Sequence, residues 1–123
     1  MNHADHLSAA RGYIELEMFS EAWEEIEALP PQEKVSPVVL DCRLRILTAL
    51  SQWDLGEQVA ATLAHAGEKE KKTVARFHHA RARGLWQSGQ HADSRSEFRK
   101  AVEAWVDVRK EFSADDLKSL FAD

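Results

Sequence analysis

The chain has 123 residues, of which 44% are hydrophobic and 30% are charged, and its formal net charge is −5. This length and balance predict a single domain over residues 1–123 that can bury a core. The negative charge disfavours nucleic acid as a partner, although a local basic face stays open. No stretch approaches the roughly 18 apolar residues of a membrane span, and the start MNHADHLS lacks a signal-peptide core. We therefore expect a cytoplasmic protein without a membrane partner.

Two helices are predicted in the first quarter of the chain. In residues 7–19, apolar side chains recur with a helical period, at Ala9, Ala10, Tyr13, Ile14 and Leu16. Ser20 is a suitable N-cap for a second helix over residues 21–29, which should end before Pro30. One face of this second helix is apolar, at Ala22, Trp23, Ile26 and Leu29.

The stretch from Ser36 to Gly67 predicts a helical hairpin. Ser36 can cap a helix that begins at Pro37, where the missing N–H costs nothing. This helix carries two apolar rows, so both of its faces should be buried. The rows are Leu40, Leu44 and Leu47, and Val39, Cys42, Ile46 and Ala49. Asp54 with Glu57 forms a capping-box pattern for the second helix, which should end at Gly67.

The last third of the chain predicts two longer helices. Residues 68–72 are a charged connector or a solvated first turn, and a helix then runs from Thr73 to Ser88, where Gly89 ends it. Another helix begins near His91 and should continue without a break to Phe112. Its apolar stripe is Phe98, Ala101, Val102, Trp105, Val108 and Phe112, and its solvent side is Glu97, Arg99, Lys100, Glu103, Asp107 and Lys110.

A short helix is predicted at the C-terminus, over residues 114–121. Ser113 with Asp116 three residues later resembles a capping box. Its apolar side chains, Leu117, Leu120 and Phe121, need a surface to dock on, because so short a helix is unstable alone. That surface is either the same chain or a neighbouring molecule. No alternating run of β-branched residues predicts a strand.

The three predicted hairpins align as an internal repeat. The aligned columns are Ala10, Leu44 and Ala82; Tyr13, Leu47 and Leu85; Phe19, Trp53 and His91; Ala22, Gly56 and Ser94; and Ile26, Ala60 and Phe98. The offsets are 34 residues from Ala10 to Leu44 and 38 residues from Leu44 to Ala82. Small residues stand where two helices must approach closely, and large ones where they can wedge between hairpins. The four extra residues fit in the connector at 68–72.

With this repeat the chain resembles the tetratricopeptide repeat (TPR) family, whose unit is a helix-turn-helix of 34 residues. The resemblance covers roughly residues 4–107, and GQHADSRSEFRKAVEAW is most similar to the second helix of the family unit. It implies an all-α fold, a right-handed superhelical stack of three antiparallel hairpins with a short C-terminal helix. The hairpins would span about residues 4–29, 37–66 and 73–112, and the middle one should be the most buried.

Catalytic motifs are not found. The sequence has no GxGxxG, GxxxxGKS, HExxH, GxSxG or CxxC pattern, so we predict neither an enzyme nor a cofactor. His3 and His6 could share a metal ion, but without a third nearby ligand we predict no metal site. The single Cys42 falls on an apolar row and is interpreted as a buried thiol.

One column of the repeat is basic. It contains Arg11, Arg45 and Arg83, and by resemblance to the TPR family it faces a concave groove. Arg11 can pair with Glu15 and Arg45 with Asp41 at a spacing of four residues. Arg83 has no acidic residue at three or four residues, so its charge is predicted to be uncompensated along its helix.

Arg83 also belongs to a polar helical stripe that ends in an aromatic ring, namely Arg76, His79, Arg83 and Trp86. The other tryptophans, Trp23, Trp53 and Trp105, are interpreted as core residues. We predict that Arg45, His79, Arg83 and Trp86 hold an acidic segment of a partner protein, the alternative being a solvated face. The candidate binding residues are therefore Arg11, Asp41, Arg45, Arg76, His79, Arg83 and Trp86.

These patterns favour a non-catalytic protein–protein interaction module that binds a peptide or protein segment on its concave helix face. The alternative is a structural adaptor or oligomerisation unit, for example one that acts like a small secretion chaperone. The sequence does not identify the partner.

Overall fold

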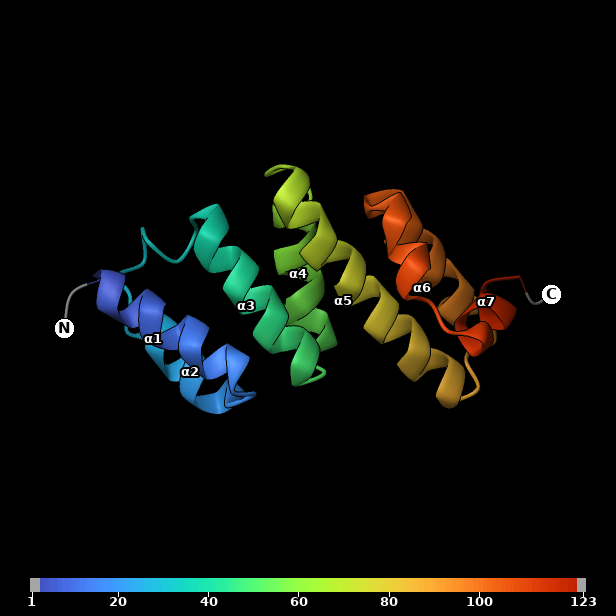
Figure 1. The fold of residues 1–123 in the computed structure, drawn as a ribbon, viewed down its shortest axis with the longest axis horizontal. Coiled ribbons are helices and arrows are strands. Elements are labelled where there is room, and N and C mark those ends of the chain that lie inside the picture. Colours follow the sequence, from blue (N-terminus) through green and yellow to red (C-terminus); the bar gives the residue numbers. More distant parts are fainter. Residues whose placement is uncertain (1–2, 122–123) are drawn as a thin grey trace. The chain divides into compact units, whose positions relative to one another are not determined.

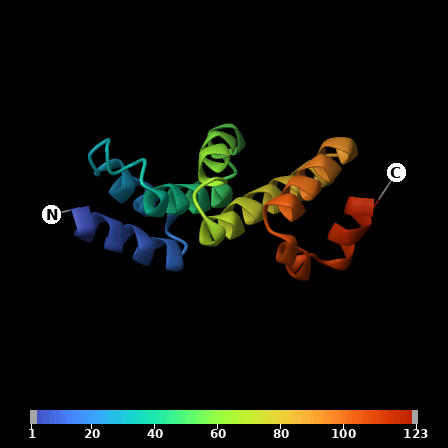
Figure 2. The same cartoon turned by 90° about the horizontal axis from the view of Figure 1, so that it is seen from above.

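The computed structural model describes the backbone of residues 3–121 and the side chains of residues 5–120. This part of the chain is all-α, as predicted, and contains no strand (Figure 1; Figure 2). Its elements are α1 (His3–Glu15), α2 (Phe19–Glu27), α3 (Pro37–Ala49), α4 (Trp53–Leu63), α5 (Glu68–Gln87), α6 (His91–Ala104), the 3₁₀ helix η1 (Val106–Glu111) and α7 (Ala114–Phe121). None of these helices is both long and apolar enough to cross a membrane.

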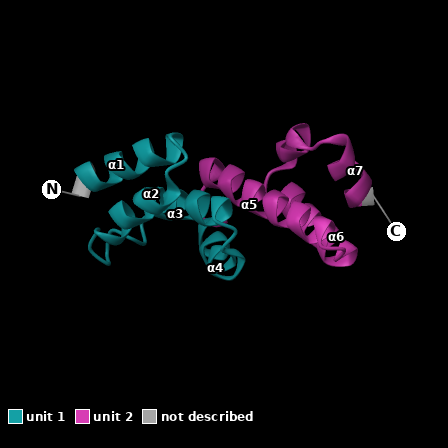
Figure 3. Ribbon diagram, turned by 90° about the horizontal axis from the view of Figure 1, so that it is seen from below, with its two compact units in different colours: residues 1–63 teal, residues 64–123 magenta. Residues whose placement is uncertain are grey.

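Contacts divide the chain into two compact units, residues 1–63 and residues 64–123 (Figure 3). In the first unit, α3 packs against both α1 and α2, and α4 packs against α3. The core that α1, α2 and α3 share consists of Ala10, Ala22, Ile26, Leu29, Val39, Cys42 and Ile46. The single domain over residues 1–123 stays a prediction.

Both predicted rows of α3 are buried, apart from Ala49 at its end. The helix starts where the sequence predicts, because Pro37 occupies its first turn and the Oγ of Ser36 accepts a hydrogen bond from the N–H of Val39 at 3.4 Å. The buried thiol predicted at Cys42 is confirmed, and burial raises the pKa of that thiol. The Ser36 cap and Pro37 fix where α3 begins, and the helical period then places its two apolar rows in the core.

Replacing Ser36 with Ala should lower the free energy of unfolding by about 0.5 to 1 kcal/mol, because the N–H of Val39 loses its acceptor. The 3.4 Å separation puts the effect in the lower part of the usual range for N-caps. Urea titration followed by circular dichroism measures the change. Ser96→Ala, on the exposed side of α6, is the matched control and should leave stability equal or slightly higher. Equal stability of Ser36→Ala and the unmodified chain would show that the cap contributes nothing.

In the second unit, α6 packs along α5, and η1 and α7 fold back against this pair (Figure 2). Two apolar clusters hold them together. One contains Ala75, Ala101 and Val108 with Val102, Ala104, Trp105 and Phe112, and the other contains Ala82, Phe98 and Leu120 with Phe112. Residues 68–72 form the first turn of α5 and not a connector, and Gly89, with φ of 83°, turns the chain after it as predicted.

The unbroken helix predicted from His91 to Phe112 is wrong. Helix α6 ends at Ala104, Trp105 is extended with φ −157° and ψ 106°, and η1 follows. The break turns the chain so that Val108 becomes fully buried in the cluster with Ala75. β-branched Val106 and Val108 are weak helix formers, so burial outweighs the loss of helix here.

Several predicted boundaries also need correction. The first helix ends at Glu15 and not at residue 19, and Met18, which makes no side-chain cap bond, precedes α2 where Ser20 was predicted to cap it. Asp54 lies inside the first turn of α4, which ends at Leu63 before reaching Gly67. The three helix pairs accordingly span residues 3–27, 37–63 and 68–104.

Candidate binding site

The predicted capping box at the start of α7 is confirmed. The N–H of Asp116 donates to the Oγ of Ser113 at 3.0 Å, and the N–H of Ser113 donates to Oδ2 of Asp116 at 2.8 Å. Asp116 takes the place that Glu or Gln usually holds in such a box. Its carboxylate is thereby fixed at the N-terminus of the helix, where the helix dipole favours a negative charge.

The same carboxylate binds two side chains of α5. Arg83 donates from Nε to Oδ1 at 3.0 Å and from Nη2 to Oδ2 at 2.7 Å, which is a bidentate pair. His79 donates from Nε2 to Oδ2 at 2.9 Å. Asp116 and His79 are buried, whereas the Arg83 side chain is 47% exposed. Helix α5 thus recognises an acidic helix N-terminus that belongs to its own chain.

The charge state of Asp116 follows from these contacts. Burial alone would raise its pKa, but the hydrogen bonds from Arg83, from the N–H of Ser113 and from His79 outweigh burial and hold the pKa far below its usual range. The hydrogen bonds that Arg83 donates to Asp116 raise the pKa of Arg83. Both groups are therefore charged at neutral pH, and the pair is a stable ionic anchor for α7.

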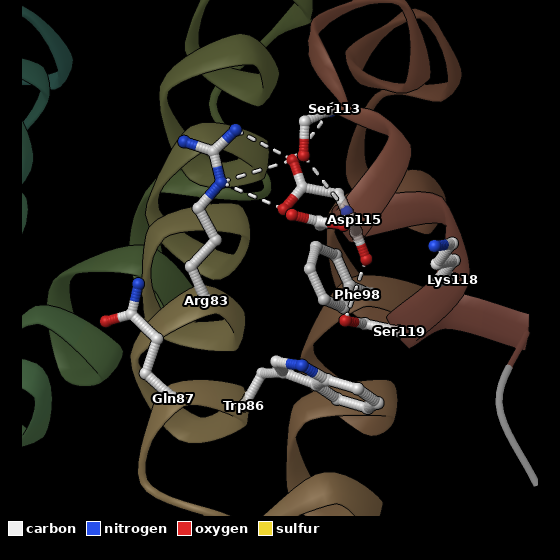
Figure 4. A pocket seen from close by; sticks show the side chains of 9 residues that line it. Arg83, Trp86, Gln87, Phe98, Ser113, Asp115, Lys118 and Ser119 are labelled. Atoms are coloured by element: carbon white, nitrogen blue, oxygen red, sulfur yellow. Dashed lines mark hydrogen bonds and ion pairs between the residues drawn. The ribbon is translucent and has the colours of Figure 1, made fainter.

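A cavity of about 420 Å³ lies beside this anchor, between α5, α6 and α7 (Figure 4). Its lining combines two cationic side chains, two carboxylates, polar groups and aromatic rings. The lining residues are Arg83, Trp86, Gln87, Phe98, Ser113, Asp115, Asp116, Lys118 and Ser119. Figure 4 shows Arg83, Trp86 and Gln87 on the α5 side and the residues of the C-terminal segment across from them. Such a surface can hold a segment that carries both a carboxylate and an apolar side chain.

Helix α7 docks on its own chain. Leu120 packs with Ala82 and Phe98, and Phe112 joins the same cluster. Leu117 stays 37% exposed, and the side chain of Phe121 lies outside the described residues. The sequence left two docking surfaces open, the same chain and a neighbouring molecule, and the structure shows α7 on the same chain.

The predicted site residues are divided between the two units. Arg11, Asp41 and Arg45 belong to residues 1–63, where Arg45 Nε pairs with Asp41 Oδ2 at 2.9 Å as predicted and Arg11 is exposed. Arg76, on α5, forms a bidentate ion pair with Glu111 of η1, with Nη2 and Oε2 2.8 Å apart. The burial and charge pairing of the described residues therefore point to the cavity beside Arg83 as the candidate site.

Arg83 was predicted to have no partner along its own helix, and its partner is indeed on another one: Asp116 of α7, 33 residues away, compensates its charge. The sequence contained a signal for Asp116, its place in the Ser113 capping box, but that signal predicted only a helix start. His79 is buried against this carboxylate, so it acts on the site through Asp116. Trp86 stacks on His91, with ring centroids 3.9 Å apart, and lines the cavity.

A second ionic cluster was missed because Glu97 was predicted to face solvent. Its side chain is only 6% exposed, and its carboxylate accepts hydrogen bonds from His78 Nδ1 at 2.6 Å and Lys100 Nζ at 3.0 Å. Arg81 Nη1 lies 3.9 Å from Oε1 of Glu97. The buried carboxylate of Glu97 is surrounded by side chains of α5 and α6 that donate to it or carry a positive charge, so we interpret the cluster as structural.

A cluster of metal ligands is not found in the described part of the chain. That part contains no group of three or more His, Cys, Asp or Glu side chains placed to hold a metal ion. His6 Nδ1 lies 2.7 Å from Glu25 Oε2, and the side chain of His3, the other histidine considered as a metal ligand in the sequence, lies outside the described residues. Comparisons with protein-family models, curated proteins and solved structures found no match to this chain. Its function must therefore be argued from its own residues.

Proposed function

We propose that this protein is a non-catalytic interaction module that binds an acidic segment of a partner protein at the cavity between α5 and α7. One observation carries the proposal: Arg83 already holds a carboxylate at this place, and the cavity beside it remains open. Arg is well suited to this task because its planar group binds carboxylates in a bidentate way.

Of the exposed groups that line the cavity, Lys118 and Gln87 fit the same type of ligand, whereas Asp115 does not. Lys118 has no ion-pair partner among the described residues, and Gln87 is exposed. The indole of Trp86 supplies a flat apolar surface of the kind that anchors many protein interfaces. A partner carboxylate can approach Lys118 or the exposed edge of Arg83 while a neighbouring apolar side chain contacts Trp86.

We also propose that the three helix pairs are degenerate TPR-like repeats. Burial repeats with the alignment: the column Ala22, Gly56 and Ser94 is buried throughout, and so are the columns Ala10, Leu44 and Ala82, and Ile26, Ala60 and Phe98. The arginine that follows the column Ala10, Leu44 and Ala82 is exposed in each pair, at Arg11, Arg45 and Arg83. A repeated pattern of buried small residues and an exposed cation suits a scaffold that presents helices to a partner.

Short synthetic acidic peptides, each paired with its amide counterpart in which Asp and Glu become Asn and Gln, test the binding proposal. The full chain should bind acidic members more tightly than their amide partners. Trp86→Ala and Lys118→Glu should each weaken binding about fivefold, or ~1 kcal/mol. Fluorescence polarisation measures the affinities.

Lys69→Glu is the matched control, because it makes the same charge change at an exposed position of α5 outside the cavity. It should bind like the unmodified chain. Arg83→Ala is a poor test alone, because Arg83 also anchors α7. The proposal is overturned if no acidic peptide binds better than its amide counterpart, or if Lys69→Glu weakens binding as much as Lys118→Glu.

A further inference from the structure

Among the described side chains of helix α7, three on one face are buried in the second unit. Asp116 binds Arg83 and His79, Ser119 is buried beside the cavity, and Leu120 packs on Ala82 and Phe98. Their positions differ by three and four residues, the spacing that puts side chains on the same side of a helix. Ala114, Asp115, Leu117 and Lys118 are exposed. The contact is that of a short helical peptide bound through one face.

Helix α7 has little stability of its own. Eight residues are too few for a stable helix in isolation, so α7 depends on its docking contacts. Short terminal helices of this kind open more readily than core helices. Opening would expose Arg83, His79 and the apolar surface of Ala82 and Phe98 together, which is a site for another helix of the same chemistry.

The docked helix also leaves its site partly empty. The cavity of about 420 Å³ is lined by both Ser119 of α7 and Trp86 of α5, and Figure 4 shows these two labelled side chains near Phe98. A helix with a larger apolar side chain in place of Ser119 would contact Trp86 and bury more surface than α7 does. A partner can therefore gain contacts that α7 lacks, which offsets the advantage that α7 has from being tethered.

We infer that α7 is an internal competitor for the binding site, and that the partner segment is a short helix of the form Ser/Thr-x-x-Asp-x-x-x-Leu. In this pattern the Asp takes the place of Asp116 and the Leu takes the place of Leu120. The inference rests on the proposed function and names the partner chemistry for the same residues of α5. Because such a partner displaces α7, it does not contact Lys118, and Lys118→Glu should leave the binding of this helical segment unchanged. Only chains in which α7 has left the site can bind the partner. The apparent association constant of the partner is therefore its intrinsic value multiplied by the fraction of open chains.

A fluorescent peptide of residues 112–121, titrated into full-length chains, tests this inference. Asp116→Ala removes the anchor of the tethered helix, so this chain should bind the peptide at least tenfold more tightly than the unmodified chain. The double variant Asp116→Ala with Arg83→Ala should lose that gain, because the peptide's own Asp has no arginine to bind. Asp115→Ala, one residue away and exposed, is the matched control and should behave as the unmodified chain does.

Circular dichroism monitors folding, and Asp116→Asn replaces Asp116→Ala if the latter unfolds. Equal affinity of the unmodified and Asp116-substituted chains for the peptide would overturn the proposed role of α7 as a competitor. A gain in affinity that survives Arg83→Ala would overturn it too. If acidic peptides still bind both chains equally, the proposed function stands while the inference fails. A dimer of the unmodified chain that the peptide does not dissociate would also overturn it, because α7 would then serve self-association.

Discussion

Replacing Phe98 with Ala should lower the free energy of unfolding of the second unit by about 3–5 kcal/mol. Phe98 is fully buried and belongs to the cluster with Ala82 and Leu120. Its ring centroid lies 5.2 Å from that of Phe112 in an edge-on arrangement and 5.8 Å from that of His79. The substitution removes contacts to α5, to α7 and to the segment after η1 at once. The void left by the missing ring therefore cannot be filled by the movement of one side chain.

Chemical denaturation followed by circular dichroism measures this effect, and two variants calibrate it. Phe98→Leu keeps an apolar side chain of similar size and should lose less than about 1.5 kcal/mol. Leu117→Ala removes a side chain of α7 that is 37% exposed and should change stability by less than about 0.5 kcal/mol. A loss below 1 kcal/mol for Phe98→Ala would contradict the central place of Phe98 in the packing of α6 and α7.

Local sequence signals predicted much of the fold. The helical periods of residues 37–49 and 73–88 depend on neighbouring side chains, and the structure shows both helices. The caps at Ser36 and Ser113 act within three residues, and both are confirmed. Such features can be predicted from one sequence because the groups that make them are adjacent in the chain.

The breaks and the ion pairs could not be predicted in the same way. Nothing local marks Trp105 as extended, because that conformation is fixed by the burial of Val108 against α5. Arg83 and Asp116 are 33 residues apart, and His78 and Glu97 are 19 apart. Helical periodicity predicts which face a charged residue lies on, but not whether a later segment covers that face. The candidate site was therefore predicted on α5 without the carboxylate that Arg83 binds.

Replacing Glu97 with Ala should lower the free energy of unfolding by about 2–4 kcal/mol. Its carboxylate is buried and accepts hydrogen bonds from His78 and Lys100, so its removal leaves the mostly buried His78 without this acceptor. Lys100 is 45% exposed and can turn to water, which keeps the loss below that of a fully buried pair. Glu103→Ala, an exposed carboxylate on the same helix, is the matched control and should cost less than about 0.5 kcal/mol.

The pH dependence separates the ionic part of this effect from lost packing. Burial alone would raise the pKa of Glu97, but the hydrogen bonds from His78 and Lys100 outweigh it and lower the pKa below the usual 4.5. As the pH falls, the unfolded chain therefore takes up the proton on Glu97 first. The stabilisation from Glu97 is present above about pH 4.5 and is lost as the pH falls below it.

Glu97→Gln keeps the shape of the side chain but has no such titration. The stability difference between the unmodified chain and Glu97→Gln should accordingly be constant above about pH 5 and should narrow as the pH falls below about 4.5. Asp116 and Glu111, whose pKa values are also lowered, titrate in both chains and cancel in that difference. A difference that stays constant over the whole range would show that Glu97 stabilises the fold by packing and not by its charge.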